Sequence, residues 1–155
     1  MKFNILKVLV LFLFATELMG CVSVGGSAVI ESGSYEGLTN SDPSKAAIFV
    51  YRDKAFVGSI NQYDVLIDSV LVGSLPNGSF FTVNTEPGQK NIKADTGAYG
   101  KGSSIVVEKS KAYCMKLTLN WCTGCKSADI TQVDNEQCNR EIKSLTKVSL
   151  EPSLK

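Results

Sequence analysis

The segment Ala46–Arg52 reads Ala-Ala-Ile-Phe-Val-Tyr-Arg, and its centre is apolar at every position from Ile48 to Val50. Successive side chains of a strand point to opposite faces, so a strand that is apolar on both faces must be covered on both. We therefore expect this segment to form a strand in the interior of a sheet.

Short runs of β-branched and aromatic residues, broken by turn signals, continue beyond this strand. The clearest turns are Asp68-Ser69, Pro76-Asn77-Gly78 and Glu86-Pro87-Gly88, because proline presets φ and Asn-Gly accepts a positive φ. The pattern predicts an all-β fold, a small antiparallel β-sandwich of about eight strands with one short C-terminal helix. The other strands are expected over residues 63–67, 70–75, 79–84, 89–95, 104–107, 112–119 and 128–133.

The helix is predicted over about Asn135–Leu145. Asp134 stands at its N-cap, and Gln137 stands at the reciprocal position of a capping box. Apolar residues recur on one helix face, which should therefore lie on the sheet. These residues are Cys138, Ile142 and Leu145.

The N-terminal residues have the pattern of a bacterial leader. Lys2 and Lys7 precede the apolar run 8–15, which is too short to span a bilayer. Leu18-Met19-Gly20-Cys21 then resembles a lipobox, in which the cysteine thiol receives a diacylglyceryl group before cleavage. We expect residues 1–20 to be a lipoprotein signal peptide and Cys21 to be the lipid attachment site. The alternative is an ordinary secretory signal that ends at a cysteine by chance.

The expected organisation is a lipidated Cys21 with a flexible tether over 21–44, a β-sandwich domain with its helix over 45–147, and a tail over 148–155. Small and polar residues dominate the tether, although Val29-Ile30 and Tyr35 could still dock on the domain. Val22 occupies the position where aspartate would signal retention in the inner membrane. We therefore expect a lipid-anchored protein of the cell envelope, on the outer membrane and facing the periplasm.

Composition excludes several functions. Loss of residues 1–20 would leave 14 basic and 14 acidic side chains of the 16 and 15 in the whole chain, so no basic surface for nucleic acid is expected. The chain has no histidine, which excludes Ser-His and Cys-His nucleophile pairs and the commonest zinc ligand. No catalytic residue, metal ligand or cofactor is predicted.

Four cysteines remain beyond Cys21, an even number in a compartment that permits disulfides. Cys114 lies about 26 Å from Cys122 along a continuous strand, too far for a bond, but near the base of the predicted hairpin where the helix begins. We therefore predict disulfides between Cys114 and Cys138 and between Cys122 and Cys125. Redox-active thiols at Cys122 and Cys125, metal binding, and free thiols are the alternatives.

Other candidate sites have simpler interpretations. Asp64 and Asp68 share a strand face, but four residues separate them by about 13 Å, so we expect two solvated acids rather than a carboxylate pair. The glycine-rich segment 96–102 lacks the spacing of a phosphate-binding loop and is predicted to be an ordinary loop. Five aromatic residues are expected in the core, although any left exposed would mark a docking surface. They are Tyr51, Phe56, Tyr63, Phe80 and Phe81.

Several short motifs together resemble an uncharacterised family of bacterial envelope lipoproteins. They are Phe49-Val50-Tyr51-Arg52, Phe56-Val57-Gly58-Ser59, Tyr63-Asp64-Val65, Leu71-Val72-Gly73, Asn77-Gly78-Ser79-Phe80-Phe81 and Glu86-Pro87-Gly88. The family is a domain of unknown function, with a β-sandwich similar to PEGA-type domains. The resemblance covers about residues 45–145, supports the fold and the location, and implies no catalytic residue.

The sequence thus favours a membrane-anchored bacterial lipoprotein that acts as a non-enzymatic binding or structural module. Its expected partners are the lipid bilayer, through acylated Cys21, and an envelope protein or glycan. The alternative hypothesis is a periplasmic thiol-disulfide exchange protein, with Cys122 as nucleophile and Cys125 as resolving thiol.

Overall fold

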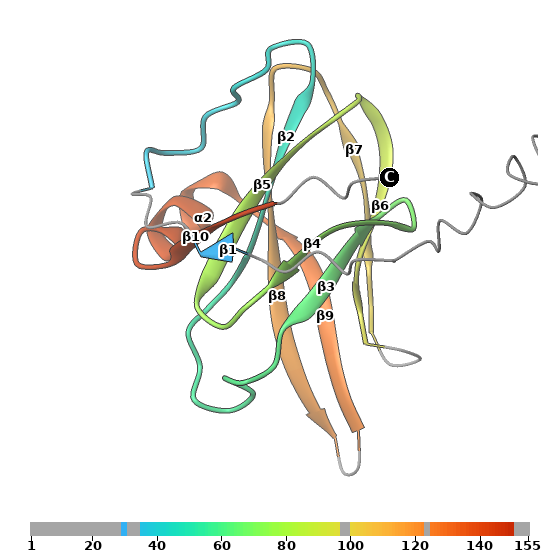
Figure 1. Ribbon diagram of the computed structural model, residues 1–155. Helices are drawn as coiled ribbons and strands as arrows, with labels where there is room; N and C mark the ends of the chain where they lie inside the picture. Colours follow the sequence, from blue (N-terminus) through green and yellow to red (C-terminus); the bar gives the residue numbers. More distant parts are fainter. Residues whose placement is uncertain (1–28, 31–34, 97–99, 123–124, 151–155) are drawn as a thin grey trace, which may run out of the picture.

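A computed structural model describes residues 29–30, 35–96, 100–122 and 125–150. These residues form two packed β-sheets and one helix, which confirms the predicted all-β sandwich (Figure 1). The first sheet has six strands in the order β1-β10-β5-β2-β8-β9. Its strands are β1 (Val29–Ile30), β2 (Ala46–Arg52), β5 (Ser79–Thr85), β8 (Ala112–Cys122), β9 (Cys125–Val133) and β10 (Thr146–Ser149). The second has four strands in the order β4-β3-β6-β7, namely β3 (Tyr63–Ile67), β4 (Val70–Leu75), β6 (Gly88–Asp95) and β7 (Ser103–Val107).

Strand β2 is the interior strand that its composition predicts. It pairs with β5 on one side and β8 on the other, and all seven of its residues are buried. One of its faces, with Ile48 and Val50, packs into the core between the two sheets. The other face, with Phe49 and Tyr51, packs into a second apolar cluster that includes residues of the helix. Both faces are therefore covered by protein, which explains the apolar side chains from Ala46 to Val50.

The six-stranded sheet is mixed rather than purely antiparallel. Strands β2 and β8 run parallel, as do β10 and β5, while the remaining pairs are antiparallel. A parallel pair needs a long connection, and the chain between β2 and β8 contains β5 and all four strands of the second sheet. The crossover between these two neighbouring strands thus passes through the second sheet, returns once to the first sheet as β5, and enters the second sheet again.

Both ends of the domain extend further than the sequence predicts. Residues 146–149 form β10, and Val148 is buried in the core between the sheets, so the tail does not begin at 148. Val29 and Ile30 pair with β10, and Tyr35 packs edge-on against Phe80 with ring centroids 5.8 Å apart. Val29-Ile30 and Tyr35, which the sequence allows to dock from within the tether, thus contact the domain.

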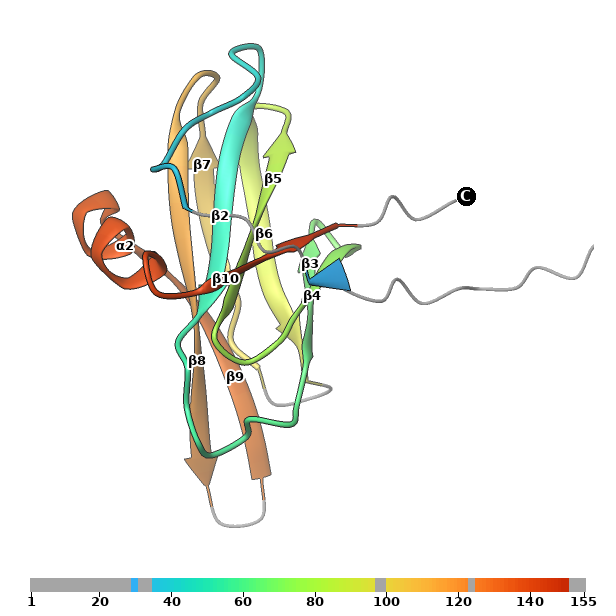
Figure 2. The ribbon, with the colours of Figure 1, turned by 60° about the vertical axis from the view of Figure 1, so that its left-hand side comes forward.

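The helix α2 (Asn135–Ile142) lies on the face of the six-stranded sheet that points away from the second sheet (Figure 2). Asp134 caps it by accepting a hydrogen bond of 2.8 Å from the backbone N–H of Gln137. The reciprocal bond of a capping box is replaced by one from the Gln137 side chain to Glu141, at 3.0 Å. Buried Cys138 and Ile142 face the sheet, as their spacing predicts.

Candidate functional site

The most distinctive surface is the connection between β2 and β3, residues 53–62, which we call the apolar loop. Phe56 and Ile60 are 96% and 93% exposed, and Val57 is 51% exposed. The expectation that Phe56 belongs to the core is wrong, whereas the other four aromatic residues assigned to it are buried. The apolar loop lies at the end of the sandwich where the hairpin of β8 and β9 projects (Figures 1 and 2).

Arg52 holds the apolar loop from inside the protein. Its side chain is 2% exposed, and its guanidinium donates to the backbone carbonyls of Asn61 at 2.7 Å and Gly58 at 2.8 Å. It also stacks over the ring of Tyr63, 5.1 Å from the centroid. Burial lowers the pKa of Arg52, but an arginine keeps its charge in proteins. A buried cation is thus engaged by loop carbonyls and an aromatic face.

Two further features fix the loop backbone. The Asn77 side chain bonds both the N–H and the carbonyl of Ala55, at 3.0 and 2.9 Å. Gly58 has φ +77°, and a Cβ there would come within 2.9 Å of the Leu119 side chain. A residue with a side chain at position 58 would therefore be both strained and crowded.

A cluster of charges links the base of the apolar loop to the helix. Lys116 Nζ lies 2.7 Å from a carboxylate oxygen of Asp53 and 2.7 Å from one of Glu141. Glu141 also accepts hydrogen bonds from the Tyr51 hydroxyl at 2.5 Å and from Gln137. Partial burial alone would raise the pKa of Glu141, but hydrogen bonds from its three partners lower it to about 2. The Tyr51 pKa is raised, first by burial and then by its bond to Glu141.

This cluster is suited to structure rather than to acid–base chemistry. Burial opposes the charge on Lys116, yet its two carboxylate partners raise its pKa. The lysine therefore stays protonated and the glutamate stays ionised at neutral pH, and neither has the pKa near 7 that a general acid or base needs. Beside them, a hollow of about 230 Å³ lies between the apolar loop and β8.

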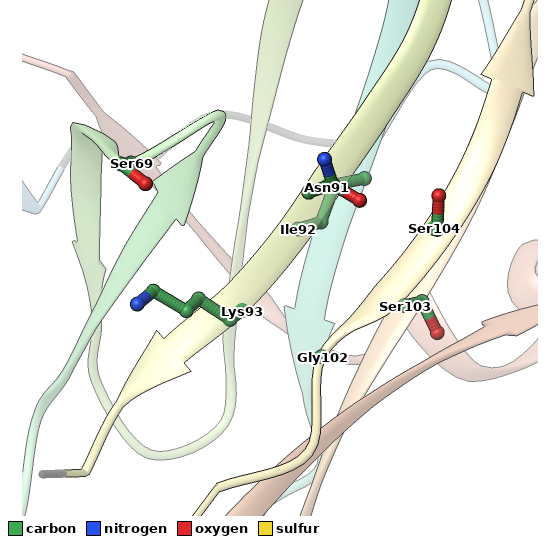
Figure 3. A pocket seen from close by; sticks show the side chains of 7 residues that line it. All are labelled: Ser69, Asn91, Ile92, Lys93, Gly102, Ser103 and Ser104. Carbon is green, nitrogen blue, oxygen red and sulfur yellow. The ribbon is translucent and has the colours of Figure 1, made fainter.

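A second hollow, of about 390 Å³, lies over the outer face of the four-stranded sheet (Figure 3). It is lined by Ser69, Asn91, Ile92, Lys93, Gly102, Ser103 and Ser104. In Figure 3 the Lys93 amine points toward the hairpin of β3 and β4, while Ser103 and Ser104 lie on β7 and point in other directions. Ser103 donates to the Ile130 carbonyl at 2.8 Å, and Ser104 accepts from Gln89 at 3.0 Å. The polar groups do not converge on one point, so this hollow is a weaker candidate.

The cysteine predictions can be tested at one pair. Cys114 on β8 and Cys138 on α2 form a disulfide with Cα atoms 6.2 Å apart, which confirms the predicted bond. The residues Cys122 and Cys125 are opposite one another in the hairpin register. Their side chains, like Cys21, lie outside what the structure describes, so the second disulfide and the lipid attachment stay predictions.

The remaining candidates do not form a reactive group. Asp64 accepts a hydrogen bond from Ser74, while Asp68 accepts from the Asn91 N–H at 2.9 Å and pairs with Lys90 at 3.2 Å. In segment 96–102, of which 97–99 lie outside the described residues, the Lys101 N–H donates to an Asp129 carboxylate at 3.0 Å. The Asp129 carboxylate would repel an anion bound at this N–H, so the segment is not suited to bind phosphate.

Two larger features of other functional classes are absent from the described part of the chain. It holds no group of three histidine, cysteine, aspartate or glutamate residues placed to bind a metal. None of its helices has the length and apolar character needed to cross a membrane.

The fold and the site define a small β-sandwich protein with a disulfide-linked helix and an exposed, braced apolar loop. The chain belongs to the family described as "Protein of unknown function (DUF2846)", whose model matches residues 42–126. The match includes β2, the apolar loop and most of the hairpin of β8 and β9. No curated protein and no solved structure matches the chain. The resemblance to a domain of unknown function is thus confirmed, while its PEGA-like and lipoprotein character stay predictions.

Sequence reasoning missed the role of Arg52 and the exposure of the apolar loop. Two signals were present in the sequence. An arginine closes an otherwise apolar buried strand, and Gly58 follows Phe56-Val57 where a continuing strand would disfavour glycine. Together they indicate a turn held by a buried cation.

Proposed function

We propose that this protein is a lipid-anchored, non-enzymatic binding or structural module of the bacterial cell envelope. Acylated Cys21 would hold a PEGA-like β-sandwich at the periplasmic face of the outer membrane. The lipobox-like spacing of Leu18-Met19-Gly20-Cys21 supports the anchor. More than one acyl chain would make attachment durable, since each buried CH₂ contributes about 0.8 kcal/mol.

The apolar loop is the observation that carries the binding role. A chain free to bury Phe56 and Ile60 would gain about 1.5–3 kcal/mol for each side chain. Here the backbone is instead braced by Arg52 and Asn77 in a conformation that exposes both. A rigid loop with exposed anchors is suited to contact with another molecule, because little conformational freedom is lost on binding.

The anchor is tested by expressing the full chain in a Gram-negative bacterium and measuring the intact mass and membrane partition of the product. Wild type and a Cys122→Ser control should lose residues 1–20, gain acyl mass and stay with membranes. Cys21→Ser should carry no acyl mass. A wild-type product with an uncleaved leader or an unacylated N-terminus would contradict the proposal.

The binding role is tested by crosslinking in living cells from exposed positions of the apolar loop and of the outer sheet face. An envelope component captured from one of these surfaces supports a binding module. Absence of any adduct from every position would count against it.

A further inference from the structure

We infer that the apolar loop binds the lipid bilayer, with Phe56 and Ile60 inserted in its interfacial region. This inference rests on the proposed function, because the bilayer is the one that would hold acylated Cys21. The protein would then contact its membrane at two points, the acyl chains and the apolar loop. This double contact would fix the orientation of the sandwich, which an acyl anchor alone does not do.

Many backbone groups of the apolar loop are hydrogen-bonded within the protein, and each of them would cost several kcal/mol in an apolar medium if it were unsatisfied. Asn77 bonds both backbone groups of Ala55. The Ser59 N–H bonds the Phe56 carbonyl at 3.4 Å, and the Asn61 N–H bonds the Gly58 carbonyl at 3.0 Å. Arg52 bonds the carbonyls of Gly58 and Asn61 from beneath. Seven backbone groups of the loop, from Ala55 to Asn61, are thus satisfied within the protein, which lowers the cost of bringing the loop into the interfacial region.

The size of the exposed surface favours lipid over a protein partner. Three side chains, Phe56, Val57 and Ile60, supply it, and a large side chain buries only about 150–250 Å². A stable protein interface needs about 800 Å² from each partner. A lipid surface requires no matching surface, so a few protruding apolar side chains are sufficient for contact.

The chain between acylated Cys21 and the folded domain is also short. The described fold begins at Val29 in β1, eight residues after Cys21, so the connection can extend at most about 28 Å. A sandwich held so close meets the bilayer at a high effective concentration, and a weak contact is then enough to orient it.

The charges around the apolar loop suit a headgroup region. Asp53, the acid in the loop, is paired with Lys116 at 2.7 Å. Lys54 is exposed and lies two residues before Phe56 in the sequence. Its amine can remain among lipid phosphates while its methylene groups follow the apolar side chains inward.

The test uses the full acylated chain in intact cells with a photoreactive residue. Phe56→p-benzoylphenylalanine and Ile60→p-benzoylphenylalanine place the probe on the apolar loop, and Lys93→p-benzoylphenylalanine is the control on the exposed outer face of β6. All three positions are exposed, so the substitutions should leave the fold intact. After illumination, intact mass spectrometry of the purified protein identifies the adduct.

We expect adducts of one phospholipid from positions 56 and 60. Their yield should exceed that from position 93 at least about tenfold, the partitioning gain of one buried apolar side chain. An adduct with another protein, an adduct of two copies of this chain, equal lipid yields at 56 and 93, or no adduct would each overturn the inference. The same spectrum shows whether Cys21 is acylated. An acylated chain without lipid adducts overturns this inference alone, whereas a chain without acyl mass overturns the proposed anchor.

Discussion

Replacement of Arg52 by methionine tests whether a buried guanidinium holds the apolar loop. The variant loses two charge-assisted hydrogen bonds, to Gly58 and Asn61, each worth about 1.5–3 kcal/mol. In wild type the buried Arg52 Nε has no partner among the described residues. The variant avoids this cost, which stabilises it by about 1–3 kcal/mol. Taken at their midpoints, the two contributions leave an expected net loss of about 2.5 kcal/mol in the free energy of unfolding. A domain of this size shifts its melting temperature by about 4 °C per kcal/mol, so we expect the melting temperature to fall by about 10 °C.

The assay is urea unfolding of the unacylated Cys21→Ser protein, combined with hydrogen exchange of the loop amides. Arg52→Met should unfold at lower urea and exchange the Asn61 amide faster, because its acceptor at Gly58 is no longer held. Lys54→Met, a neighbouring exposed cation, is the matched control and should change stability by less than about 0.5 kcal/mol. An Arg52→Met protein with wild-type stability and unchanged loop exchange would refute the bracing role.

Three further outcomes are expected from urea unfolding of the same unacylated protein. Joint replacement of Cys114 and Cys138 by serine should cost about 3.5 kcal/mol, because the bond closes a loop with a sequence separation of 24; equal stability would show that the bond contributes nothing. Glu141 has a folded-state pKa of about 2 against an ordinary 4.5, so its stabilising contribution is present above pH 4.5 and is lost as pH falls toward 2. Glu141→Gln should therefore reduce the acid dependence of stability between those values, and an unchanged acid profile would contradict the charge cluster. Phe56→Ser should change stability by less than about 0.5 kcal/mol, whereas Phe81→Ala in the core should cost about 3–5 kcal/mol; similar losses would show that Phe56 is not a surface residue.

The features predicted correctly from the sequence are those with a local physical signal. Strand β2 is apolar on both faces, and both faces are covered. The alternation along β8 places Cys114 on the face opposite Met115, and the helix that carries Cys138 covers that face. A two-residue period and a hairpin register were therefore enough to predict the disulfide.

The features missed depend on partners far away in the chain. Nothing within residues 146–149 specifies that this strand joins β5 in parallel or that it offers β1 an edge to pair with. The parallel pairing of β2 with β8 likewise follows from the crossover as a whole. Composition also predicted burial of Phe56, since apolar character alone does not separate a core side chain from an exposed one.

The contacts that hold the apolar loop keep its apolar side chains exposed, so their exposure is a property of the fold. An apolar residue at position 52 would avoid the cost of burying a cation, which is considerable unless its hydrogen bonds are made. The chain instead buries Arg52 against two loop carbonyls, while Asp53 at the start of the loop is tied through Lys116 to Glu141 on α2. The disulfide fixes that same helix to β8, the strand that carries Lys116. Hydrogen bonds, ion pairs and one disulfide thus connect the apolar loop, β8 and α2. A loop held in this way exposes the same apolar surface to any binding partner.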